Sequence, residues 1–581
     1  MSRSTRRFAR ANVRASLDFH RPIRKRSCMR PLHLCAFVLS TLILGCTPPR
    51  QNVELILHNG AVYTMNAAQP QVQAIAIDAR RIVALGSDEE ISRAYRGHVD
   101  VDLKGQMVLP GFHDAHVHPV YGGIELAQCN LTDLDSIEAI TTKVGECNKD
   151  SPGSGWLIGA GWNLSLFPQA NPNKELLDAI STERPIFLGG ADGHSSWANS
   201  KALTLAGIER ETPDPHNGVI ERNAKGEASG TLRESAQDIV RAVIPGLTAE
   251  ARRDGLLRGL KMANQFGITS FVEAAAGSEE LAAYRALDSQ GELTARVVAS
   301  IAVANADADA LMNPQDRGSD AKLRTDSAKI FVDGVLEGET AALLEPYLDN
   351  PGFSGNLKTS PEELTARVVA LDRRGIQVHM HAIGDRAVRV ALDAVESARK
   401  ANGPSDNRHH IAHLQMIDPV DRPRFAQLGV IANFQALWAF PDQYITDVNL
   451  PQVGQARIDQ MYPIGDVLRA GGRIVGGSDW SVSSMNPLLA IETAVTRSDP
   501  TGRTKGVLNA SERVSLQDML EAYTINGAYL MHQEKLAGSL EVGKAADVIV
   551  LERDLFKIPP EGIGEVAVTR TIFDGTTVYS R

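Results

Sequence analysis

Apolar runs that end in polar or ionisable residues recur along the middle of the chain. They occupy residues 105–118, 267–273, 295–301, 328–333, 376–381, 409–413, 430–433 and 473–479. Each has the composition of a buried β-strand, and segments with helical periodicity, such as 362–374 and 387–401, separate the later ones. Eight strands alternating with helices close a (β/α)8 TIM barrel, so we predict an α/β protein with this barrel over residues 106–530. In such a barrel, catalytic residues lie at the C-terminal ends of the strands.

The count of eight holds only if residues 119–250 form an insertion after the first strand. This region has strand-like runs of its own at residues 156–162 and 184–188. Loops carried by a rigid scaffold often bear function, so we expect the insertion to form a lid or substrate wall over the barrel mouth.

Both ends of the chain show short β patterns without long helices between them. Residues 53–63 and 74–86 contain strands and tight turns, and residues 538–551 and 566–579 repeat this pattern. We predict that residues 46–105 and 531–581 close one small β-sandwich beside the barrel. Two unrelated β caps are the alternative.

Composition and charge narrow the class of protein. The 581 residues are 43% hydrophobic and 22% charged, which is typical of a globular protein. Residues 1–45 contain ten Lys or Arg residues and one acidic residue, so the rest of the chain carries 50 basic and 69 acidic residues. This acidic body would repel a phosphate backbone, which argues against nucleic acid as a partner.

The basic N-terminus is followed by an apolar run, residues 32–45, that ends at Cys46. The run is short for a membrane span and fits the apolar region of a secretory signal. Its end, Leu-Ile-Leu-Gly-Cys, resembles a bacterial lipobox, where the signal is removed before the cysteine and the cysteine is acylated. We therefore expect residues 1–45 to be a signal segment whose true start is Met29. An ordinary cleaved signal or a short anchor is the alternative.

The lipobox implies an exported protein that faces the periplasm and contacts the membrane only through the lipid on Cys46. The next residue is Thr47 rather than the aspartate that would, by analogy, hold a lipoprotein at the inner membrane. We therefore expect anchoring at the outer membrane of a Gram-negative bacterium. Cys129 and Cys147 would then be the two remaining cysteines, and an oxidising compartment would allow a disulfide between them, although the sequence does not give their separation.

The first strand-like run ends in two histidines, His116 and His118. On a strand, positions i and i+2 face the same way, so both imidazoles can reach one metal ion. Neutral imidazole is the commonest protein ligand for zinc and similar ions. A polar turn after a strand is the alternative.

Lys329 lies in an otherwise apolar strand, where a buried ammonium is costly and tends to lose its proton. An uncharged lysine can react with carbon dioxide to give a carbamate, whose two oxygens can bridge two cations. The alternative is a side chain that reaches solvent or pairs with Asp333.

Three further metal donors occupy strand ends: His381 on the fifth strand, His413 on the sixth and Asp479 after the eighth. Each alone has an ordinary explanation, as a hydrogen-bonded core histidine or a helix cap. Six donors at the strand ends of one barrel are improbable by chance, so together they indicate a metal centre.

The order His-x-His, Lys, His, His, Asp on strands one, four, five, six and eight resembles the amidohydrolase superfamily. The flanking phrases are similar to its amidohydrolase 3 or YtcJ-like branch, which includes N-substituted formamide deformylase. They are LPGFHDAHVH (109–118), DGHSSWANSKAL (192–203), KIFVDG (329–334), HAIGDRA (381–387), GSD (477–479) and GKAAD (543–547). The resemblance extends from residue 53 to residue 581.

The resemblance implies a centre of two divalent metal ions, with zinc as the expected metal. His116, His118 and Asp479 would hold one ion. His381 and His413 would hold the other, with carboxylated Lys329 and a hydroxide between the two. Asp479 would take the proton of that hydroxide and deliver it to the leaving nitrogen.

Residues of the insertion are candidates for substrate binding. Trp162, Asp192 and His194 follow short strands, where aromatic and polar residues often line a ligand site. Packing inside the insertion is the alternative for all three. Glu337 and Glu339 depart from the small residues common in this branch, and we expect them to face solvent rather than to favour amine-bearing substrates.

These features favour a metal-dependent hydrolase of a non-peptide C–N bond, with an N-acyl or N-formyl amine as the small-molecule amide substrate. A second interpretation is a deaminase of the same superfamily that uses one ion and an uncarboxylated Lys329. A third is a lipoprotein that keeps the barrel for binding without catalysis. Metal counting separates the first two, and turnover of N-acyl amines tests the third.

Overall fold

The structure is a computed structural model that describes residues 49–581 except 133, 152 and 154. The expected signal segment, the start at Met29 and the lipidation of Cys46 therefore lie outside the described residues. Among the residues that it does describe, no helix has the length and apolar character needed to cross a membrane.

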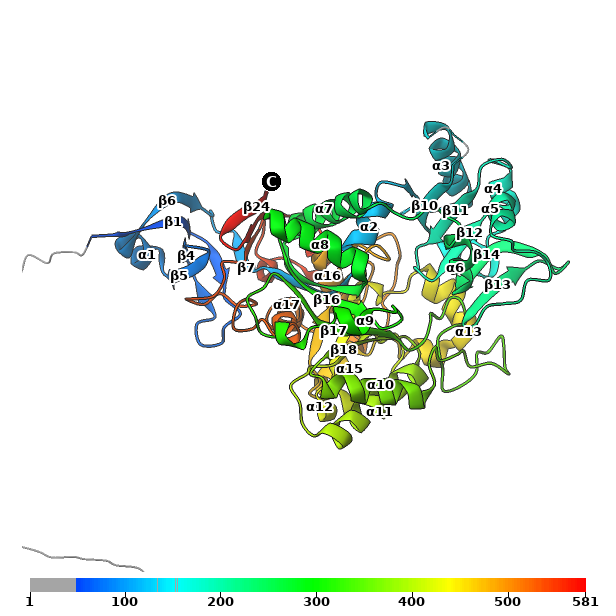
Figure 1. Cartoon of the computed structure of the whole chain (residues 1–581). Helices are drawn as coiled ribbons and strands as arrows, with labels where there is room; N and C mark the ends of the chain where they lie inside the picture. The colour runs from blue at the N-terminus through cyan, green and yellow to red at the C-terminus, as the bar shows by residue number, and fades with distance from the viewer. Residues whose placement is uncertain (1–48, 133, 152, 154) are drawn as a thin grey trace, which may run out of the picture. The chain divides into compact units, whose positions relative to one another are not determined.

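Eight parallel strands form the central sheet, each paired with the next in sequence (Figure 1). They are β8 (Phe112–Val117), β15 (Ile268–Ala276), β16 (Arg296–Ala302), β17 (Leu323–Phe331), β18 (Gln377–Ala382), β19 (His410–His413), β20 (Ile431–Phe434) and β21 (Ile474–Gly476). All eight expected strands are present. The sheet confirms the predicted TIM barrel.

The barrel closes between its first strand and the segment after its last. The Asp479 amide donates to the His116 carbonyl at 2.7 Å, and the His118 amide donates to the Trp480 carbonyl at 3.0 Å. Gly477 permits this approach, since a Cβ there would lie 2.8 Å from the Cβ of His116. Closure therefore places Asp479 directly beside the His-x-His strand.

One of the helices on the outside of the barrel begins at a cap that the sequence supplies. Helix α10 (Pro361–Arg373) has a capping box, in which Ser360 and Glu363 satisfy each other's backbone N–H groups. Its buried face packs on the barrel, and α11 (Asp385–Asn402) follows after β18. Both helices agree with the segments expected at 362–374 and 387–401.

The two chain ends share one sheet, which also confirms the predicted sandwich. Strand β7 (Met107–Pro110) pairs parallel with β2 (Ala61–Tyr63) and antiparallel with β22 (Val548–Leu551), which continues to β23 (Val568–Phe573) and β24 (Thr576–Ser580). The other sheet contains β1 (Gln51–His58), β4 (Ala74–Asp78), β5 (Arg81–Gly86) and β6 (Tyr95–Asp102). A common apolar core holds side chains from both ends, including Leu57, Ile75, Val108 and Val548. In Figure 1, the red C-terminal strands accordingly lie beside the blue N-terminal ones.

The run at residues 105–118 is two strands rather than one. Residues 107–110 belong to the sandwich as β7, and the barrel begins at Phe112 instead of residue 106. The division falls at Gly111, where any Cβ would collide with the side chain of Thr269. The apolar run looks continuous in the sequence because β7 and β8 are both fully buried, each in its own sheet.

The insertion has a six-stranded mixed sheet and a core of its own. Its strands are β9 (Cys129–Asn130), β10 (Leu157–Trp162), β11 (Ile186–Gly190), β12 (Ser195–Ala198), β13 (Gly218–Arg222) and β14 (Ala228–Glu234). A disulfide joins Cys129 on β9 to Cys147 on α3 (Ile137–Asp150), with the two Cα atoms 5.8 Å apart. The open question of these two cysteines is thereby answered.

Candidate metal centre

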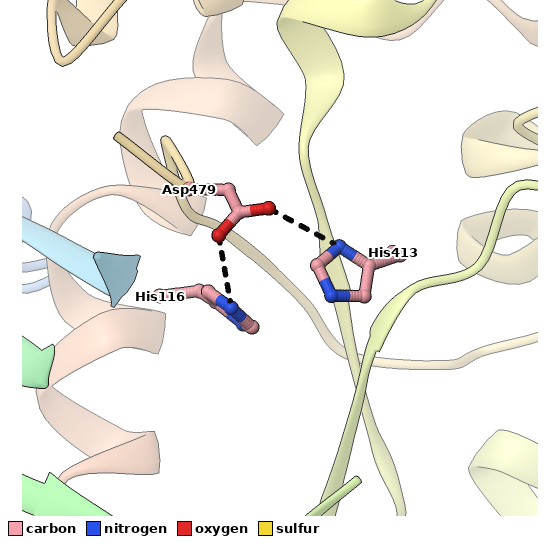
Figure 2. A group of neighbouring side chains, drawn as sticks. All are labelled: His116, His413 and Asp479. Atoms are coloured by element: carbon pink, nitrogen blue, oxygen red, sulfur yellow. Dashed lines mark ion pairs between the residues drawn. The ribbon is translucent and has the colours of Figure 1, made fainter. Parts of the chain in front are cut away.

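The His-x-His pair converges on Asp479. The Nε2 atoms of His116 and His118 each lie 3.2 Å from Oδ1 of Asp479. The Nδ1 atom of His413 lies 3.9 Å from the other carboxylate oxygen, and Figure 2 shows the His116 and His413 rings on either side of that carboxylate. The ligand atoms of His116, His413 and Asp479 lie within 4.8 Å of one another.

Lys329 and His381 complete the group. Nζ of Lys329 lies 3.4 Å from Nε2 of His116, and the rings of His381 and His413 have centroids 4.4 Å apart. The Nε2 atom of His381 lies 3.1 Å from the carbonyl oxygen of Gly334, which leaves its Nδ1 for a ligand role. The structure thus brings all six predicted donors together at one end of the barrel.

Burial and neighbouring charges together set the protonation of these donors. Burial lowers the pKa of His116 to about 3, with help from the neighbouring Lys329 charge, so the ring is the neutral form that binds metals. Burial also lowers the pKa of Lys329 to about 7. Burial alone would raise the pKa of Asp479, but His116 and His118 hold it well below its usual range. His118 itself has its pKa raised to about 9, because the neighbouring carboxylates of Asp479 and Glu273 outweigh burial.

Two features of the donors fit a cation between them. Nδ1 of His413 is buried and makes no hydrogen bond with any of the described residues, although a buried polar atom normally has a partner. His413 and Asp479 also adopt left-handed backbone conformations, with φ of 78° and 52°. Such conformations are costly for residues other than glycine and persist mostly at functional sites. The donor set therefore suits a metal ion.

The three candidates from the insertion have different positions. The His194 ring lies 5.2 Å from the ring of His381, centroid to centroid, so His194 borders the metal site. Asp192 accepts hydrogen bonds from the amide and hydroxyl of Ser195, which stabilise the loop before β12. Trp162 is fully buried in the core of the insertion and donates to the Leu188 carbonyl at 3.0 Å. This position agrees with the alternative interpretation, in which Trp162 packs inside the insertion. The structure gives no support for contact between Trp162 and substrate.

Sequence reasoning missed three residues that support the site. Nε2 of His379 lies 2.9 Å from Nδ1 of His116. Oε1 of Glu273 lies 3.5 Å from Nδ1 of His118. Glu234 accepts from His194 Nδ1 at 3.0 Å. The spacing of His379 and His381 repeats the His-x-His pattern and could have indicated the first. Glu273 ends a predicted strand, whereas no local pattern links Glu234 to His194.

A cavity of about 1350 Å³ lies between the insertion and the barrel loops. Glu234 and Lys358 line it and form an ion pair at 2.7 Å. The Phe331 ring lies 5.3 Å from Nζ of Lys358 and 4.8 Å from Nζ of Lys329, which places the cavity next to the metal donors. Glu337 and Glu339 also line the cavity and are half-buried, so both are only partly exposed to solvent, and burial raises the pKa of Glu337.

The sequence and the fold both have known relatives. A model of the amidohydrolase family matches residues 100–579. The chain is 29% identical to the putative amidohydrolase YtcJ of Bacillus subtilis, over 91% of this chain and 100% of that protein. It is 27% identical to N-substituted formamide deformylase of Arthrobacter pascens, over 91% and 98%.

Among solved structures, an uncharacterized metal-dependent hydrolase from Pyrococcus furiosus is similar, with a TM-score of 0.66 and 27% identity over 87% of this chain and 100% of that one. The family match covers most of the chain, and the alignments with the two relatives cover nearly the full length of each relative. The protein belongs to the amidohydrolase family and is a metal-dependent hydrolase that acts on carbon–nitrogen bonds.

Proposed function

We propose that this hydrolase cleaves the C–N bond of a small-molecule amide, an N-acyl or N-formyl amine, with two divalent metal ions. The observation that carries the proposal is the carboxylate of Asp479, 3.2 Å from both Nε2 atoms of the His-x-His pair. The resemblance to a formamide deformylase supports the substrate class.

The donor residues would have separate roles in metal binding and proton transfer. His116, His118 and Asp479 would hold one ion, zinc being the expected metal, and His381 and His413 the other, with carboxylated Lys329 as the bridge. Bound ions of this kind lower the pKa of water and polarise a carbonyl oxygen. Asp479 would accept a proton from water and deliver it to the leaving nitrogen.

The substrate has a place beside these donors. The cavity between the insertion and the barrel is large enough for a drug-sized molecule. His194 links the cavity to the metal donors, since its partner Glu234 lines the cavity and its ring lies 5.2 Å from the ring of His381. We therefore assign substrate contact to His194, and only support of the adjoining loop to Asp192.

A panel of N-formyl and N-acyl amines tests the proposal on metal-reconstituted protein. Asp479→Asn should lower kcat at least about 100-fold, as loss of a proton-transfer group does. Asp309→Asn, at an exposed position, serves as the matched control and should leave kcat unchanged. About two metal ions per chain support the binuclear site, whereas one ion with deaminase activity would replace the proposal by the mononuclear alternative. Absence of turnover by a fully metallated protein would favour the binding lipoprotein.

We also propose that the protein is exported and anchored by a lipid on Cys46 at the outer membrane, facing the periplasm. The disulfide between Cys129 and Cys147 supports an oxidising compartment. Cys46→Ser should leave the protein unprocessed or move it from the membrane to the soluble fraction. Mass spectrometry that finds an unmodified mature N-terminus at another residue would refute the anchor.

A further inference from the structure

His116 and His118 direct the same ring nitrogen, Nε2, toward the centre of the site. Their surroundings must keep that nitrogen free of a proton if it is to bind a metal. A neutral imidazole carries its proton on one nitrogen and can bind a metal only through the other. Both rings direct Nε2 at Oδ1 of Asp479. The partners of the two Nδ1 atoms therefore decide whether Nε2 is free.

The Nδ1 atom of His116 has a buried partner inside the barrel. It lies 2.9 Å from Nε2 of His379 on β18, and Nδ1 of His379 lies 3.2 Å from the hydroxyl of Ser300 on β16. That hydroxyl lies 2.8 Å from the hydroxyl of Ser327 on β17. All four side chains are buried, so water does not compete for these hydrogen bonds.

This series of hydrogen bonds can run in two directions, and only one of them suits metal binding. If Nδ1–H of His116 donates to His379, then Nδ1–H of His379 donates to Ser300, whose hydroxyl donates to Ser327. Nε2 of His116 is then unprotonated. In the opposite direction His379 would donate to Nδ1 of His116, and the neutral His116 ring would carry its proton on Nε2, where it blocks a metal.

His118 has a comparable partner from another strand. Oε1 of Glu273 on β15 lies 3.5 Å from its Nδ1. The second oxygen of Glu273 accepts a hydrogen bond of 2.8 Å from the Tyr284 hydroxyl on α8 (Ser278–Gln290), which fixes the carboxylate. Glu273 is fully buried, and a carboxylate in this position favours a proton on Nδ1.

We propose that His379 and Glu273 are positioning residues that hold the Nδ1–H groups of His116 and His118 and so leave both Nε2 atoms for one metal ion. The inference rests on the metal site of the proposed function. It assigns no chemical step to either residue. Loss of such an outer partner typically weakens metal affinity 10–100-fold.

Zinc affinity of the full chain, measured by competition with a chromophoric chelator, tests the role of His379. His379→Phe removes the acceptor but keeps a planar ring, and it should weaken the tighter zinc site by about tenfold or more. His379→Gln can place an amide oxygen near the former Nε2 and should restore most of that affinity. A merely structural role would not separate these two variants.

His409→Gln is the matched control, because His409 is an equally buried barrel histidine that pairs with Asp372 on α10, at 3.0 Å, and not with the metal donors. It should leave zinc affinity unchanged even where it lowers the unfolding temperature. Circular dichroism establishes that each variant is folded. Should His379→Phe bind zinc like wild type, or His379→Gln bind as weakly as His379→Phe, the role of His379 is wrong.

Glu273 is tested by the same competition assay. Glu273→Leu removes the acceptor and should weaken zinc binding by about tenfold or more, whereas Glu273→Gln keeps an oxygen for Nδ1–H and should lose less. Equal affinities of Glu273→Leu and wild type contradict its role. These failures differ from failure of the proposed function, in which the wild-type chain itself would bind no zinc or turn over no amide.

Discussion

The buried lysine should make the metal-free protein less stable than a variant without it. Lys329 is 1% exposed, and burial lowers its pKa from 10.5 to about 7. The difference between these pKa values corresponds to about 5 kcal/mol, which is the free energy by which the folded state disfavours the charged amine. At pH 7, where half of the buried amine is already neutral, about 4 kcal/mol of this penalty remains.

The penalty depends on pH in a defined direction. The unfolded chain keeps the Lys329 proton up to about pH 10.5, whereas the folded chain keeps it only up to about pH 7. The unfolded state therefore binds more protons between these values, and stability rises with pH across that window. Below pH 7 the penalty is complete, and above pH 10.5 it is absent.

Chemical unfolding of chelator-treated protein measures this effect. Lys329→Met has similar length without charge and should unfold at higher denaturant concentration than wild type at pH 6.5, with a smaller gap at pH 9.5. Lys400→Met, at an exposed position, should shift neither midpoint. Equal midpoints at pH 6.5, or a gap that widens at pH 9.5, would refute the reasoning.

With metal present, the order of the two proteins should reverse. Zinc should stabilise wild type more than Lys329→Met, because the variant lacks the proposed bridge between two ions. Lys329→Ala should lose activity by orders of magnitude, and short carboxylic acids should restore part of it by occupying the place of the carbamate. Lys329→Arg should not recover activity, since a guanidinium keeps its charge. A Lys329→Ala variant that keeps two ions and near-normal turnover would exclude the bridge.

Three other substitutions test the packing that supports the site. Gly477→Ala should lower zinc affinity, because its Cβ would lie 2.8 Å from the Cβ of His116. A Cβ at Gly145 would meet no atom within 4 Å among the described residues beyond its own stretch of helix, so Gly145→Ala should be neutral in the same titration. Trp162→Ala should lower the free energy of unfolding by about 3–5 kcal/mol but leave the KM of the folded protein nearly unchanged; a large rise in KM would restore Trp162 to the substrate site. Arg296→Met strands the buried carboxylate of Asp547, 3.1 Å from Nε of Arg296, and should cost about 3–5 kcal/mol in denaturant unfolding, so a neutral result would contradict this view of the pair.

The barrel could be predicted because each of its strands is a local pattern. The run at residues 376–381 and the observed β18 differ by one residue at each end. The same pattern predicted where the six metal donors lie, since His381 and His413 both fall at strand ends. The first strand was placed too early because an apolar run does not reveal which of two sheets buries it.

Partners across the fold could not be predicted in the same way. Trp162 follows a short strand, and the sequence looks the same whether its indole faces a ligand or the core of the insertion. His194 and Glu234 are 40 residues apart and meet only because β12 and β14 pair. Glu337 likewise has a partner far along the chain, Asn449, whose amide donates to its carboxylate at 3.3 Å.

The pairing of β7 with β22 also bears on the order in which the protein is made. Residues 107–118 run from the sandwich directly into the metal-binding strand, yet one neighbour of β7 is synthesised more than 400 residues later. During synthesis, β7 exposes an unpaired edge until residues 548–551 arrive. The His-x-His segment, which directly follows β7, therefore has its complete sheet support only after residues 548–551 have paired with β7.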